Sequence, residues 1–185
     1  MHNLLRLLSA IALVGLAAIA LSSPRPASAE PKTRENFAPD GIVLLKQIRH
    51  YKRQTWKWQR LMGVPRTRAG DHTSVKNLTY RRWVRNVWHR RALHAWRRAK
   101  SPPRLSAWLC IHHHEGPWND PNPPYYGGLQ MDLSFQRRYG RDLLRRKGTA
   151  DRWTPLEQMW VAERAYRAGR GFYPWPNTAR HCGLI

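Results

Sequence analysis

Apolar residues recur at alternating steps of four and three between positions 44 and 62, which is the spacing of one helix face. Gly63 and Pro65 follow this run and predict its end. A second helical pattern runs from position 80 to 99 and ends at Ser-Pro-Pro (101–103), because proline cannot continue a helix. The pattern therefore predicts two long helices. Their apolar faces hold Leu44, Ile48, Tyr51, Thr55, Trp58 and Met62, and Val84, Trp88, Ala92, Ala95 and Ala99, respectively.

The C-terminal block, residues 104–185, predicts three shorter helices. The first spans 105–114 and precedes a loop, 119–128, that is rich in Asn, Pro, Tyr and Gly. The second runs from an Asp132 cap to Lys147. The third begins at Thr-Pro-Leu-Glu (154–157), which combines an N-cap, a proline at the first helical position and a capping box. It would reach Ala168. These patterns predict a mainly α fold, with an α+β fold as the alternative.

The first 29 residues have the pattern of a secretory signal peptide. A short basic start precedes an apolar run of about 15 residues, and Ala-Ser-Ala (27–29) offers a cleavage site. A bilayer span needs roughly 20 apolar residues, so a cleaved signal is favoured over a membrane anchor. The sequence therefore predicts a secreted protein, extracellular or associated with the cell wall, that starts with a polar lead-in from Glu30.

Positive charge is concentrated ahead of the C-terminal block. The mature chain loses only Arg6 and Arg25 and keeps 31 Lys and Arg against 11 acids, a net charge of +20. Residues 41–104 hold 18 of these cations against one acid, Asp71, which exceeds what solubility needs. An exported protein rarely meets nucleic acid. We therefore expect residues 41–100 to bind anionic cell-wall polymers or a membrane surface.

Five tryptophans alternate with arginine in this basic region, and two interpretations stay open. They could contact an anionic polymer or membrane. They could equally form the packed interior of a helical hairpin whose arginines are solvated. The five are Trp56, Trp58, Trp83, Trp88 and Trp96.

Glu115 stands at the end of an apolar helix and is followed by Gly-Pro-Trp (116–118). Among Trp108, Trp118 and Tyr125 its carboxyl would lose hydration, which favours the protonated form that a general acid needs near neutral pH. A plain helix-end glutamate facing water fits the local sequence equally well.

Five motifs then follow one another in a specific order: Glu-Gly-Pro-Trp (115–118), Tyr-Tyr-Gly-Gly-Leu-Gln (125–130), Ala-Glu-Arg (162–164), Trp-Pro (175–176) and Cys-Gly (182–183). Over about residues 104–183 this order resembles the transglycosylase-like domain of resuscitation-promoting factors. The resemblance implies a compact lysozyme-like domain, here preceded by a basic helical segment (30–103), that cleaves the glycan strands of peptidoglycan.

The resemblance also implies individual roles. Glu115 matches the catalytic glutamate, Trp118 the aromatic residue after it, and residues 126–130 the stretch that lines the sugar groove. Cys110 and Cys182 match the family's cysteine pair, and export independently favours a disulfide. Two departures stand out. Four residues separate the first cysteine from the glutamate, which it usually precedes directly, and the usual Ser-Gly-Gly-Asn is shortened to Gly-Pro.

The groove residues have physical roles of their own. Gly127 and Gly128 allow close approach of the backbone to a ligand, and Gln130 can donate to and accept from an N-acetyl group. Tyr125 and Tyr126 offer flat faces to sugar rings. An ordinary turn with packed tyrosines is the alternative.

No metal or cofactor is expected. Of the residues 112–115 (His-His-His-Glu), only His112 and Glu115 could share a helix face, and no paired metal-ligand spacing is present. The resemblance implies that one glutamate suffices, so neither Asp120 nor Asp132 is assigned as a second carboxylate. The prediction is a monomeric muramidase or lytic transglycosylase acting on the β-1,4 bond between N-acetylmuramic acid and N-acetylglucosamine. The alternative is a non-catalytic cationic wall- or membrane-binding protein.

Overall fold

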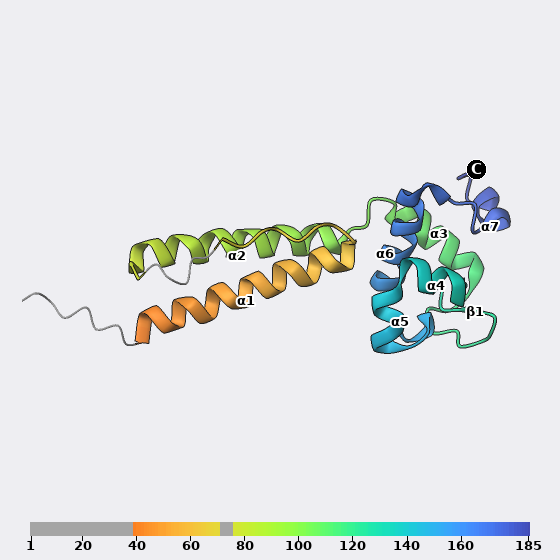
Figure 1. Cartoon of the computed structure of the whole chain (residues 1–185). Helices are drawn as coiled ribbons and strands as arrows, with labels where there is room; N and C mark the ends of the chain where they lie inside the picture. The colour runs from red at the N-terminus through yellow and green to blue at the C-terminus, as the bar shows by residue number, and fades with distance from the viewer. Residues whose placement is uncertain (1–38, 71–75) are drawn as a thin grey trace, which may run out of the picture. The chain divides into compact units, whose positions relative to one another are not determined.

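Two long helices, α1 (Pro39–Met62) and α2 (Leu78–Lys100), lie side by side and run in the same direction (Figure 1). A computed structural model describes residues 39–70 and 76–185, so the predicted signal peptide and nearly all of the lead-in lie outside the described residues. The start of α1 meets the start of α2, where Gly41 approaches Arg81. The end of α1 meets the end of α2, where Met62 packs with Ala95 and Ala99.

The parallel arrangement corrects the expectation of a helical hairpin, in which the two helices would be antiparallel. The 24 residues of α1 form a helix about 36 Å long. The 15 residues between Met62 and Leu78 can span roughly 50 Å when extended, which is enough to return along α1. Hydrogen bonds fix the start of this return: Trp56 Nε1 donates to Thr67 O (3.0 Å), and Gln59 bonds both the backbone and the hydroxyl of Thr67.

The predicted faces pack the two helices together. Leu44, Ile48, Thr55 and Met62 of α1 are buried, as are Val84, Trp88, Ala92, Ala95 and Ala99 of α2, which confirms both patterns. Some tryptophans of the basic region pack between the helices and others lie on the surface, so each of the two interpretations fits part of the set. Trp88 is buried and Trp56 packs edge-to-face against it, whereas Trp83 and Trp96 are 55% and 42% exposed.

The C-terminal block is mainly helical, as predicted. Its elements are α3 (Leu105–Glu115), β1 (Tyr125–Tyr126), β2 (Met131–Asp132), α4 (Leu133–Tyr139), α5 (Arg141–Lys147), the 3₁₀ turn Ala150–Arg152, α6 (Pro155–Ala165), the π-turn Tyr166–Arg170 and α7 (Pro176–His181). The two strands form one antiparallel ribbon in which Tyr125 faces Asp132. No helix of the described residues is both long enough and apolar enough to cross a bilayer.

Caps and breaks explain where the local predictions hold and where they do not. The Asp132 cap and the Thr154–Glu157 capping box are both present. The helix expected over 132–147 is broken at Gly140, where the Trp153 ring lies 2.5 Å from the position a Cβ would occupy. The third helix is α-helical to Ala165 and then widens into the π-turn Tyr166–Arg170, in which Gly169 (φ 88°) leaves the helical conformation at the predicted stop.

Side chains of α6 make hydrogen bonds to several other helices. Glu163 is completely buried, and its carboxylate accepts hydrogen bonds from the Arg104 backbone, the Arg104 guanidinium and Trp108 Nε1, all at 2.9 Å. The three donors belong to two residues at the start of α3, Arg104 and Trp108, so Glu163 anchors the helix that carries Glu115. This gives Ala-Glu-Arg (162–164) a structural role.

The same helix holds the ends of the long helices. Trp160 Nε1 donates to Ala99 O (2.7 Å), near the end of α2. Arg164 donates to Leu61 O (2.9 Å) and to Tyr139 O (2.6 Å), which lie near the ends of α1 and α4. Each bond satisfies a carbonyl that has no partner inside its own helix. Residues 39–185 accordingly belong to one compact unit.

Candidate active site

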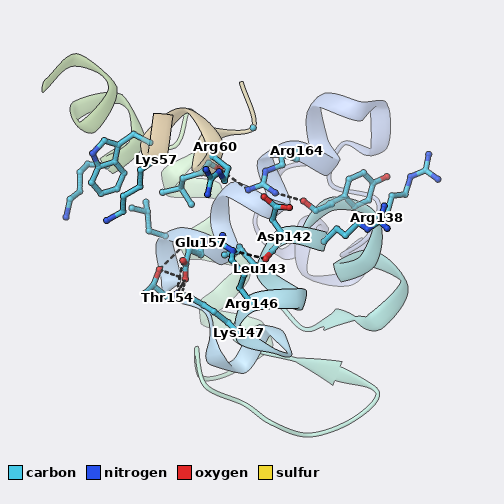
Figure 2. A pocket seen from close by; sticks show the side chains of 17 residues that line it. Lys57, Arg60, Arg138, Asp142, Leu143, Arg146, Lys147, Thr154, Glu157 and Arg164 are labelled. Atoms are coloured by element: carbon cyan, nitrogen blue, oxygen red, sulfur yellow. Dashed lines mark hydrogen bonds and ion pairs between the residues drawn. The ribbon is translucent and has the colours of Figure 1, made fainter. Parts of the chain in front are cut away.

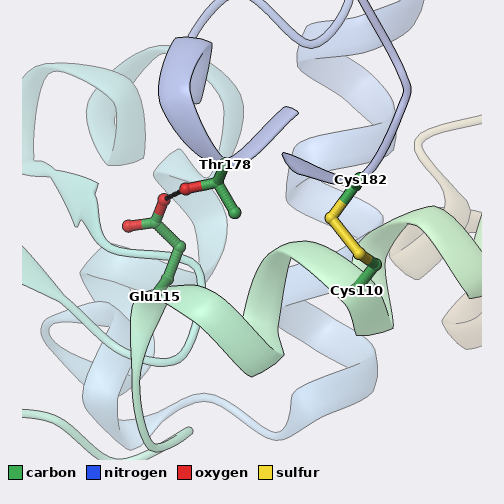
Figure 3. The surroundings of a disulfide bond; sticks show 4 residues. All are labelled: Cys110, Glu115, Thr178 and Cys182. Atoms are coloured by element: carbon green, nitrogen blue, oxygen red, sulfur yellow. Dashed lines mark hydrogen bonds between the residues drawn. A yellow bond between two sulfur atoms is a disulfide. The ribbon is translucent and has the colours of Figure 1, made fainter. Parts of the chain in front are cut away.

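The disulfide between Cys110 and Cys182 links α3 to the residue that follows α7 (Figure 3). The two Cα atoms lie 6.1 Å apart, within the usual range for a disulfide. The predicted pairing is therefore confirmed, even though four residues separate Cys110 from Glu115. The bond secures a helix of only six residues, α7, to the helix that ends at Glu115.

Glu115 is the last residue of α3 and is half-buried. The hydroxyl of Thr178, from α7, donates a hydrogen bond to Glu115 Oε1 (Figure 3). Thr178 is itself buried and lies one helical turn before Cys182. Within the described part of the chain, the second carboxyl oxygen, Oε2, has no hydrogen-bond partner. One oxygen is thus held and the other is available.

Gln130 lies beside the chain just after Glu115. Its Nε2 is 3.7 Å from the position a Cβ on Gly116 would occupy, and Asp120 Oδ2 is 3.8 Å from it. Gln130 donates from Nε2 to Asp120 Oδ2 (2.8 Å) and to Gly127 O (3.0 Å). The hydrogen bond from Gln130 lowers the pKa of Asp120 below its ordinary value, with further help from the backbone of Asn122. The structure thus places Gln130 beside Gly116, the residue that follows Glu115.

A cavity of about 540 Å³ opens beside Gln130. Of the predicted site residues, Tyr125 and Gln130 line it; Glu115 does not. Asp132 also lines it, with its carboxylate held at the start of α4 by Phe135 N and Ser134 Oγ, both at 2.7 Å. The backbone hydrogen bond from Phe135 lowers the pKa of Asp132 and outweighs its partial burial. The volume is in the range of small-molecule sites.

The other predicted groove residues, Trp118, Tyr126, Gly127 and Gly128, do not line this cavity. Trp118 stacks on His112 with ring centroids 3.8 Å apart, and His112 Nδ1 lies 3.2 Å from Gly128 O. A Cβ on Gly128 would lie 2.6 Å from His112, and one on Gly127 would lie 2.6 Å from Gln158. Both glycines are buried, so their close neighbours are protein side chains. These contacts favour the packed-turn interpretation of the glycine pair. Tyr126 is half-buried against the same core.

The histidine run forms no site with Glu115 in the described residues. The group there that has metal-ligand spacing is Cys110, His114 and Cys182, whose donor atoms lie within 4.8 Å of one another. Both sulfurs of this group are joined in the disulfide.

Two residues of the site were not identified from the sequence. Thr178 holds Glu115, and Tyr173, which is 72% exposed, lines the cavity. Thr178 stands four residues before Cys182, so a cross-link to α3 together with helical periodicity was the available clue.

No family model matches the chain, and comparison with curated proteins and with solved structures also gives no match.

Proposed function

We propose that this chain is a secreted glycosidase that cleaves the β-1,4 bond between N-acetylmuramic acid and N-acetylglucosamine in peptidoglycan, with Glu115 as its single catalytic carboxyl group. The observation that carries the proposal is the carboxyl at the end of α3, held by Thr178 from a second helix and next to a loop that bears Gln130. The ordered motifs from Glu115 to Cys182, which resemble the transglycosylase-like domain of resuscitation-promoting factors, support the same assignment. The disulfide accords with an oxidising compartment.

Glu115 acts as the general acid. Because Thr178 occupies Oε1, Oε2 carries the proton and delivers it to the glycosidic oxygen as the bond to the anomeric carbon breaks. The resulting carboxylate then removes a proton from the incoming nucleophile. With water as nucleophile the product has a reducing muramic acid end. With the muramoyl 6-hydroxyl it has a 1,6-anhydro end. Charge develops at the anomeric carbon in both cases, and the substrate's own N-acetyl or hydroxyl group stabilises it.

The cavity beside Gln130 holds the sugar. Tyr125 and Tyr173 present exposed rings that suit the apolar faces of pyranose rings. The Gln130 carbonyl oxygen is free to accept from an N-acetyl N–H, since the hydrogen bonds of its side chain are made through Nε2.

The test is mass spectrometry of purified peptidoglycan digested by the wild-type chain and by Glu115→Gln. Wild type releases muropeptides, and Glu115→Gln loses at least about a hundredfold in rate, because glutamine cannot donate the proton. Asp132→Asn is the matched control. Asparagine still caps α4, and no proton transfer is assigned to Asp132, so its release of muropeptides should fall far less than that of Glu115→Gln even though Asp132 lines the cavity. Near-normal release by Glu115→Gln would disprove the catalytic assignment.

A non-catalytic binding role has its own support. The pair of long helices exposes Trp83 and Trp96 among lysines and arginines, which suits adsorption to an anionic surface. Wall binding by the wild-type chain without any released muropeptide would favour this alternative over the enzyme.

A further inference from the structure

A second cavity, of about 710 Å³, lies where the ends of α1 and α2 meet the C-terminal block (Figure 2). Eight lysines and arginines line it, against two acids, Asp142 and Glu157. Its cations come from α1, α2, α4, α5 and α6, so they converge from several sides on one space. Like charges gathered around a cavity repel one another unless an anion lies between them.

The two acids leave most of this charge unmatched. Lys147 Nζ donates hydrogen bonds to both carboxylate oxygens of Glu157, at 2.8 and 2.7 Å. Asp142 forms a long ion pair with exposed Arg145, outside the cavity, at 3.9 Å, and its charge also favours the protonated form of Arg164. Arg60 and Arg141 are exposed and have no acidic partner among the described residues. Two separate guanidinium groups are therefore available to a ligand.

Arg164 provides a fixed cation in the same cavity. Its two terminal nitrogens donate to Leu61 O and Tyr139 O (Figure 2), while its buried Nε has no hydrogen-bond partner among the described residues. Burial, and then the neighbouring Arg167, lower the pKa of Arg164 to about 10, so it stays protonated at neutral pH. The lining also includes Trp58 and Leu61, which give it an apolar face.

The two cavities share a wall. Arg138 and Tyr139 line both the cationic cavity and the cavity beside Gln130. A polymer branch attached to a strand in the second cavity could therefore reach the first. This continuity distinguishes the cationic cavity from the arginines spread over the rest of the long helices.

We propose that the cationic cavity binds a phosphodiester segment of an anionic polymer carried by the wall glycan. The identification of the polymer's source rests on the proposed function; the binding chemistry does not. Arginine forks pair with phosphate oxygens, and the apolar face contacts the polyol or sugar between phosphates. Repeated charge along the ligand matches cations that are spread over several helices.

Binding is measured by calorimetry with an oligo(glycerol phosphate) probe, using the full chain with Glu115→Gln so that no turnover occurs. Arg60→Gln combined with Arg141→Gln should weaken binding by about tenfold or more, since two charge-assisted contacts are lost. Arg82→Gln combined with Arg90→Gln is the control: it removes the same charge from exposed positions of α2 that do not line the cavity, and binding should change little. Circular dichroism verifies that all variants are folded.

Equal loss in both double variants would overturn the proposal, because binding would then follow net charge alone. Equal binding of polyglutamate of matched charge would overturn the phosphate assignment. A wild-type chain that cleaves peptidoglycan while its Glu115→Gln form fails to bind the probe contradicts this inference and leaves the enzyme intact. Cavity-dependent binding without any cleavage supports the inference and contradicts the enzyme.

Discussion

Replacing Cys110 and Cys182 together by serine removes a cross-link between residues 72 apart in sequence. In the chain-entropy model, closing a loop of that length lowers the entropy of the unfolded chain and stabilises the fold by about 4 kcal/mol at 25 °C. The Cα separation of 6.1 Å requires no movement of the backbone to form the bond. The double variant should therefore lose about this much free energy of unfolding.

Urea denaturation followed by circular dichroism measures this loss as a lower midpoint. Heating should show a fall in melting temperature on the order of 10 °C for a unit of this size. Wild-type protein treated with a reducing phosphine should match the double variant, which separates loss of the bond from the effect of serine. An unchanged midpoint, or two thiols that react in unreduced wild-type protein, would refute the reasoning.

The same variant should lose glycan cleavage under conditions in which most of the protein is still folded. α7 has six residues and carries Thr178, whose hydroxyl holds Glu115. Helices this short are marginal without tertiary support. Without the disulfide, α7 separates from α3 more often, and the carboxyl loses its fixed orientation. Muropeptide release measured at a temperature where the double variant is still folded tests this; activity equal to wild type would contradict it.

Three further predictions concern single carboxyl or hydroxyl groups. Thr178→Val should lower muropeptide release while costing only about 1 kcal/mol of stability, and Thr178→Ser should restore release; an inactive serine variant would count against a positioning role. Glu163→Gln should cost roughly 3 kcal/mol in urea denaturation, because three donors lose a buried carboxylate; a change under about 1 kcal/mol would contradict the anchoring role. Burial alone would raise the pKa of Glu157, but hydrogen bonds from Lys147 and the Thr154 backbone outweigh it and hold the pKa below its ordinary 4.5. The stability from this group is therefore complete above about pH 4.5 and is lost as pH falls through the folded value, so Glu157→Gln should flatten the acid limb of a pH–stability curve.

The sequence by itself determined the local elements. Apolar residues at helical spacing identified the buried faces of both long helices, and the Asp132 cap and the Thr154–Glu157 capping box marked helix starts correctly. These signals are readable because the hydrogen bonds of a helix and its caps join residues three or four positions apart. The cysteine pair was predictable as well, since only two cysteines exist and the expected export would favour their oxidation.

Only the tertiary structure decided how distant residues meet. The direction of α2 depends on the return of the chain past Gln59, and the break at Gly140 on the approach of the Trp153 ring. Thr178 holds Glu115 across 63 positions, and Arg164 reaches Leu61 across 103. Contacts at such separations depend on how the whole chain packs. The residues around each partner therefore show no periodic pattern that would predict them. The cationic cavity arises in the same way, because its lining converges from five helices only once the chain is folded.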